Sequence, residues 1–158
     1  MFAIFFAFCL VSSMCCSVNA SGTGGRSQVL PDPDLGGDGT ILRTLNASSL
    51  TGLTHTSSFE KPNLPSGAST VAVSGNFKHT GASGLTTPSI RAGIGYYRAG
   101  TTTVDSLSSK DYFGVNVSVY SSVSVSSINN NVKYVGFVKN VAPSYGTVSG
   151  SLTVYTLN

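Results

Sequence analysis

The sequence predicts an all-β chain, an antiparallel β-sandwich of about seven or eight strands with an Ig-like or jelly-roll arrangement. After residue 39, apolar residues alternate with polar or small residues at the period of a strand. No segment of ten or more residues has the apolar spacing of an amphipathic helix. Only 9% of the 158 residues are charged, whereas 42 are Ser or Thr and 18 are Gly. That composition excludes a helical bundle or coiled coil, whose polar faces need Glu and Lys.

Residues 1–20 have the features of a signal peptide. An apolar run, MFAIFFAFCL, is followed by Val18-Asn19-Ala20, a small-residue pattern that signal peptidase reads. All three cysteines lie in this segment, so cleavage after Ala20 leaves a mature chain without a disulfide or a stable membrane span. A lipid-modified Cys15 or Cys16, or a retained membrane anchor, are the alternatives. We therefore expect a secreted protein, extracellular or at the cell surface.

Residues 21–39 are rich in Gly, Ser, Pro and Asp and predict a flexible N-terminal arm or linker. Asp32, Asp34 and Asp38 bring three carboxylates together in a Gly-rich stretch, which favours weak calcium binding. The spacing departs from the EF-hand loop, because Arg43 stands where that loop has its last Glu. A solvated linker is the competing interpretation, and no other cofactor is expected.

The β-sandwich domain is expected over residues 40–158, beginning with a short strand at Thr40–Leu45. Leu50–Phe59 is ambiguous, and the prolines of Glu60–Ala68 predict a loop. Ser69–Thr80 is a clear strand. Its core face is expected to carry Val71, Val73, Phe77 and His79, with Ser74, Asn76 and Lys78 opposite.

Gly81–Pro88 predicts a loop, and Ile90–Ala99 a strand whose core face carries Ile90, Ala92, Ile94 and Tyr96. Gly93 and Gly95 on its other face indicate a close neighbour or a β-bulge. Tyr112–Ser127 has the strongest alternation in the chain, with Phe113 and five valines on one parity. It predicts one long strand, or two with a kink near Ser121-Ser122.

The last third of the chain predicts two more strands, Val132–Lys139 and Thr147–Leu157. The turn before the first contains Asn129-Asn130-Asn131, because Asn tolerates left-handed backbone. Pro143–Gly146 forms the turn before the second. The core face of the closing strand is expected to carry Val148, Leu152 and Val154.

Charge and motifs exclude several classes of function. The net charge is +3, and the basic residues are scattered, so no nucleic-acid partner is expected. The sequence has no nucleophile elbow and no zinc-binding histidine pair. Few side chains could serve in acid–base catalysis, namely His55, His79 and Glu60. His79 is expected to lie at a rim or to be partly buried. We therefore expect a non-enzymatic protein; a small secreted hydrolase is the remote alternative.

The polar strand faces carry Ser, Thr, Asn and Gly in place of charge. Natural monomers protect strand edges with charge, and Val117–Ser127 has neither charge nor Pro, so an exposed edge there would pair readily. The arm would suit strand donation to a neighbour. These features predict a structural or adhesive domain that acts by self-assembly or surface binding, as a fibre, coat or surface-layer subunit. Its partner is then a second copy of the chain.

A carbohydrate-binding, lectin-like module is the alternative, with a surface glycan as partner. Tyr97, Tyr120 and Tyr155 have the parity opposite to core residues, so their rings are candidates for stacking on a sugar. The competing interpretation is that these rings cover a second packed sheet. The sequons at Asn46 and Asn116 are candidate glycosylation positions in a suitably equipped host.

Overall fold

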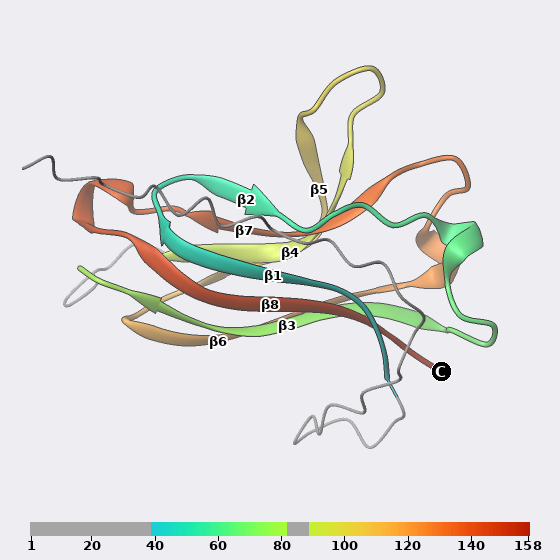
Figure 1. The fold of residues 1–158 in the computed structure, drawn as a ribbon, viewed down its shortest axis with the longest axis horizontal. Helices are drawn as coiled ribbons and strands as arrows, with labels where there is room; N and C mark the ends of the chain where they lie inside the picture. Colours follow the sequence, from blue (N-terminus) through green and yellow to red (C-terminus); the bar gives the residue numbers. More distant parts are fainter. Residues whose placement is uncertain (1–38, 82–88) are drawn as a thin grey trace, which may run out of the picture.

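The computed structural model describes residues 39–81 and 89–158, and it confirms the predicted all-β class. Two four-stranded antiparallel sheets pack into a β-sandwich (Figure 1). Sheet A has the order β1 (Thr40–Leu50), β8 (Val148–Leu157), β3 (Thr70–His79) and β6 (Asn116–Ser124). Sheet B has the order β2 (Leu53–His55), β7 (Tyr134–Asn140), β4 (Ile90–Tyr97) and β5 (Val104–Tyr112). Short 3₁₀ turns occur at Lys61–Asn63, Val125–Ser127 and Pro143–Tyr145.

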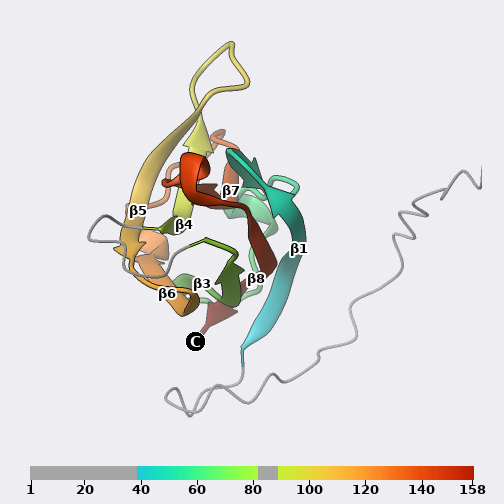
Figure 2. The ribbon, with the colours of Figure 1, turned by 90° about the vertical axis from the view of Figure 1, so that its left-hand side faces the viewer.

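The hydrophobic core fills the space between the sheets, which curve around it in the end-on view of Figure 2. The strands predicted at Ser69–Thr80, Ile90–Ala99 and Thr147–Leu157 contribute the core residues expected of them. From sheet A these include Val71, Val73, Phe77, Val148, Leu152 and Val154, and from sheet B Ile90, Ala92, Ile94 and Val138. Their burial is the main stabilising contribution, since residues 39–81 and 89–158 form only two ion pairs, both largely exposed.

At Gly136 in β7, side chains of sheet A pack directly against the backbone of sheet B. A Cβ there would lie 2.5 Å from Val154 Cγ2, and 3.3 Å from both Leu152 Cδ2 and Val73 Cγ1. These three side chains belong to sheet A, so the missing side chain of Gly136 lets them reach the backbone of sheet B.

The prediction for Tyr112–Ser127 is wrong in its first part. Tyr112 ends β5, and the chain turns at Gly114, which has a φ of 112°. Phe113 is 58% exposed and not in the core, because the turn interrupts its alternation with the valines. β6 begins at Asn116, runs without a register shift against β3, and gives way to a 3₁₀ turn at Val125.

The other strand boundaries differ less from the predicted ones. β1 continues past Leu45 to Leu50, and the ambiguous Leu50–Phe59 contains the short β2. β5 is not predicted, because its Ser, Asp and Lys residues do not alternate with apolar ones. The expected bulge beside Gly95 is present as a register shift against β5, and Asn131 has the expected left-handed φ, 63°.

Residues 1–20, most of the arm at 21–39 and most of the Gly81–Pro88 loop lie outside the described residues. Within 39–81 and 89–158, no helix is long and apolar enough to cross a membrane.

Candidate binding face

The outer face of sheet A carries hydroxyl and amide side chains from all four of its strands. Val71, Val73 and Phe77 point into the core, so the alternate residues of β3 point outward. Cross-strand pairing aligns them with their neighbours in rows. We call this surface the hydroxyl–amide face; its rows are Tyr120–Ser74–Thr153–Thr44, Ser118–Asn76–Ser151–Asn46 and Asn116–Lys78–Ser149.

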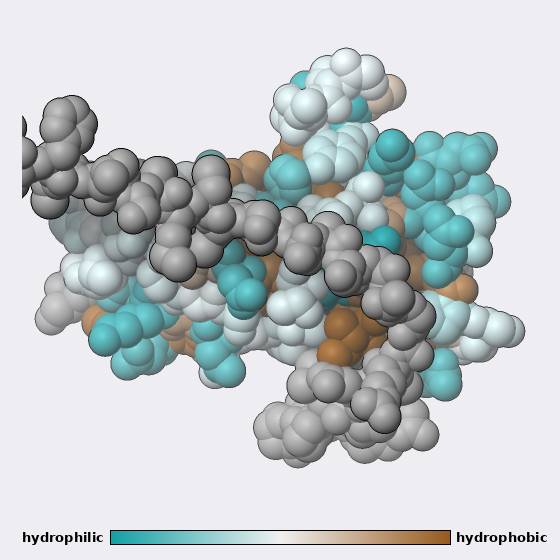
Figure 3. All heavy atoms as spheres, in the orientation of Figure 1, coloured by the Kyte–Doolittle hydropathy of each residue, from teal (hydrophilic) through white to brown (hydrophobic). Residues whose placement is uncertain are grey.

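The hydroxyl–amide face is nearly neutral. Lys78 carries the one charge among the residues in these rows, and none of them is acidic. Within the face, the Ser118 hydroxyl donates a hydrogen bond of 2.8 Å to Asn76 Oδ1. Figure 3 shows the side of the molecule on which β1 lies, where brown apolar residues are confined to patches between teal and white ones. The neutral polar strand faces expected from the sequence are therefore present on the outer face of sheet A.

An open groove of about 290 Å³ lies at one end of this face. Asn76 and Lys78 of β3, Asn116 and Ser118 of β6 and Ser149 of β8 line it with polar groups, and Phe77 and Val117 complete it. Asn46 and Asn116, the two sequon asparagines, are both exposed and lie in neighbouring rows of this face. A glycan at Asn116 would occupy the groove.

The three candidate tyrosines do not share a surface. Tyr120 lies half-buried on the hydroxyl–amide face. Tyr155 belongs to the next row of the same sheet, beside Ala72, but it is only 6% exposed and so offers no open stacking surface. Tyr97 lies on sheet B, where its ring meets His55 edge-on at 5.5 Å and its hydroxyl lies 3.3 Å from His55 Nδ1.

His79 lies on the core face of its strand, as predicted, but it is fully buried and not at a rim or in a partly buried position. Its Nδ1 accepts a hydrogen bond from the Gly81 N–H, so Nε2 carries the proton and donates to Asn140 Oδ1 at 3.3 Å. Asn140, also buried, donates to the carbonyls of Leu50 and Gly146. This network connects β3, β7, the end of β1 and the turn before β8, and it holds this end of the sandwich together.

His55 and His79 belong to opposite sheets, and their rings form hydrogen bonds with hydroxyl, amide and backbone groups. In the described part of the chain, no three His, Cys, Asp or Glu residues are grouped so as to hold a metal ion. Asp32, Asp34 and Asp38, the candidate calcium ligands, lie outside the described residues.

The strand edges are protected by individual side chains. On β1, the Arg43 guanidinium donates to the carbonyls of Leu42 and Ser58, and two register shifts distort the edge. On β6, the Tyr112 hydroxyl contacts the backbone of Tyr120. Burial raises the pKa of Tyr112, and the hydrogen bond from the Tyr120 backbone partly opposes that shift.

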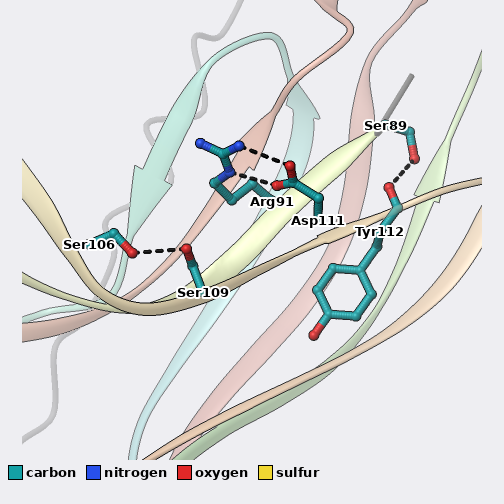
Figure 4. Close-up of polar contacts among 6 residues, drawn as sticks. All are labelled: Ser89, Arg91, Ser106, Ser109, Asp111 and Tyr112. Atoms are coloured by element: carbon teal, nitrogen blue, oxygen red, sulfur yellow. Dashed lines mark hydrogen bonds and ion pairs between the residues drawn. The ribbon is translucent and has the colours of Figure 1, made fainter.

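β5 is held to β4 by two ion pairs. Arg91 meets Asp111 through two hydrogen bonds, of 2.6 and 2.9 Å, and Arg98 meets Asp105 in the same manner (Figure 4 shows the first). The hydrogen bonds from each arginine lower the pKa of its aspartate partner. In Figure 4 the Tyr112 ring points away from the Arg91–Asp111 pair, as alternation along β5 requires.

No protein-family model matches the chain, and no curated protein and no solved structure matches it either. Function is therefore inferred from the chemistry of the surfaces described above.

Proposed function

We propose that the chain is a non-catalytic, adhesive β-domain that binds a surface glycan through the hydroxyl–amide face. The supporting observation is the regular array of neutral hydrogen-bonding side chains over four adjacent strands. A face with this composition has little charge to attract nucleic acid and little apolar area to bury against a protein partner.

The chemistry of the face matches that of a sugar. Each sugar hydroxyl both donates and accepts hydrogen bonds, and Ser, Thr and Asn side chains offer both functions. The groove beside Asn76 and Ser118 gives these groups a concave setting, and the Tyr120 ring lies in the adjoining row. Because Lys78 is the one charged group in the rows, binding is expected to depend weakly on salt.

The proposal is tested by screening the full chain on a glycan array and measuring the affinity for the best ligand by calorimetry. Asn76→Ala and Ser118→Ala are each expected to weaken binding by about tenfold, since each removes hydrogen bonds worth about 1 kcal/mol or more.

Ser109→Ala is the matched control for Ser118→Ala. Ser109 accepts a hydrogen bond from the neighbouring Ser106 hydroxyl, as Ser118 donates one to Asn76, but it lies on sheet B. The glycan affinity of Ser109→Ala is expected to equal that of the unmodified chain. Equal losses of affinity in Ser109→Ala and Ser118→Ala would contradict the proposal, and so would a full chain that binds no glycan.

A further inference from the structure

Among the described strands, β6 forms one edge of sheet A, and its own sequence has none of the usual protections of an edge strand. Its residues, NVSVYSSVS, include no charge and no proline, and it pairs with β3 without a bulge. The other edges differ: β5 carries Asp105, Lys110 and Asp111, and β2 has only three residues. β6 is therefore the edge best suited to receive another strand.

The direction of its backbone groups follows from its ladder. Val115 accepts a hydrogen bond from His79 N–H, and Val125 N–H donates to Ser69, so odd-numbered residues of this segment face β3. In an antiparallel pair the even-numbered residues then point their N–H and C=O groups away from the sheet. Ser118, Tyr120 and Ser122 thus present the groups that an added strand would use.

The Tyr112 hydroxyl occupies the place where an added strand would bond to Tyr120, the middle one of these three residues. It accepts a hydrogen bond of 2.8 Å from the Tyr120 N–H and donates one to the Tyr120 carbonyl. The two contacts satisfy both backbone groups of one edge residue, as a paired strand would. The ring packs against the core, and a 2.9 Å hydrogen bond between Ser108 and Ser121 holds β5 beside β6.

We propose that Tyr112 is a latch on the β6 edge, and that releasing its hydroxyl allows β6 to pair with β6 of a second copy of this chain. The latch goes beyond the proposed glycan binding and does not depend on it. Two β6 strands pair antiparallel across a twofold axis around Tyr120, which places uncharged Ser and Val residues opposite one another.

The latch itself is tested by hydrogen exchange of backbone amides in the full chain. In the unmodified protein the Tyr120 amide is expected to be protected, while the Ser118 and Ser122 amides exchange rapidly. Tyr112→Phe keeps the ring and removes the hydroxyl, so the Tyr120 amide is expected to exchange about tenfold faster. Equal exchange of the Tyr120 amide in the two proteins would overturn the latch.

The partner is tested by light scattering over a concentration series. The unmodified chain is expected to stay monomeric, and Tyr112→Phe is expected to form dimers as concentration rises. Adding Ser122→Lys to the Tyr112→Phe chain is expected to restore the monomer, because each lysine would lie opposite Ser118 of the other copy and bring a charge into the uncharged β6 pair.

Tyr97→Phe is the matched control, since it removes a tyrosine hydroxyl that lies on sheet B and bonds no edge backbone. It is expected to leave the mass unchanged. A Tyr112→Phe chain that exposes the Tyr120 amide yet stays monomeric would overturn the assignment of a second β6 as partner. A dimer that survives Ser122→Lys would overturn it as well.

Discussion

At the scale of single residues, the buried side chain of Asn140 forms four hydrogen bonds. Its side chain donates to the Leu50 and Gly146 carbonyls and accepts from the Ala142 N–H and the His79 ring. All four functions of its amide are used. Removing it leaves the buried His79 ring and Ala142 N–H, and the partly buried Leu50 and Gly146 carbonyls, without this partner, which is costlier than the loss of the bonds themselves.

Asn140→Ala is therefore expected to destabilise the fold by about 3 kcal/mol or more, measured by urea denaturation. Asn76→Ala removes the same amide from an exposed position and is expected to change stability by less than about 0.5 kcal/mol. Similar losses of unfolding free energy in the two variants would contradict a stabilising role of the buried hydrogen bonds.

At the scale of elements, β5 is a strand held by polar contacts. Few of its residues are buried, but two arginines of the β4 segment bind its aspartates, and Ser89 donates to the Tyr112 carbonyl at its end (Figure 4). These contacts fix Tyr112 in position over β6. Because β5 is held by ion pairs and hydrogen bonds, its residues do not alternate between apolar and polar. The sequence therefore does not predict this strand.

Asp111→Asn is expected to cost less than about 1 kcal/mol at neutral pH, because the Arg91 and Asp111 side chains remain 45% and 31% exposed. The folded state lowers the pKa of Asp111, so this contribution is present above its usual value of 3.8 and is lost as the pH falls through the lowered pKa. Denaturation curves from pH 7 down to pH 2 measure it. The stabilities of the variant and the unmodified chain should converge at the acid end; a constant difference would contradict this origin.

At the scale of the whole molecule, the sandwich depends on the fit between its two sheets. Gly136 lies where Val154 and Leu152 of sheet A pack against the backbone of sheet B. A side chain added there has no free space, so the sheets must separate or the core must shift.

Gly136→Ala is accordingly expected to destabilise the fold by about 1–3 kcal/mol in thermal or urea denaturation. Gly52→Ala is the control, because a Cβ at Gly52 would meet no atom within 4 Å. Adding Val154→Ala to Gly136→Ala should cost less than the sum of the two single changes, since it vacates the contested space. If the losses of unfolding free energy from the two changes are strictly additive, the destabilisation by Gly136→Ala does not arise from its contact with Val154.

The sequence alone was sufficient for the all-β class and for the core faces of β3, β4 and β8. Each of these strands has a buried face and a polar face, and burial imposes a period of two on the residues. The neutral composition of the polar faces was equally visible, because it needs no knowledge of which strands are neighbours.

The tertiary structure decided which residues share a surface. Tyr97, Tyr120 and Tyr155 have the same parity relative to their strands, yet they occupy two sheets and differ in burial. Asn76 and Ser118 are 42 positions apart and meet only because β3 pairs with β6. Tyr112 reaches the β6 edge only because β5 belongs to the opposite sheet. Alternation specifies the face that a side chain takes, whereas the order of strands, set by long-range pairing and core packing, specifies its neighbours.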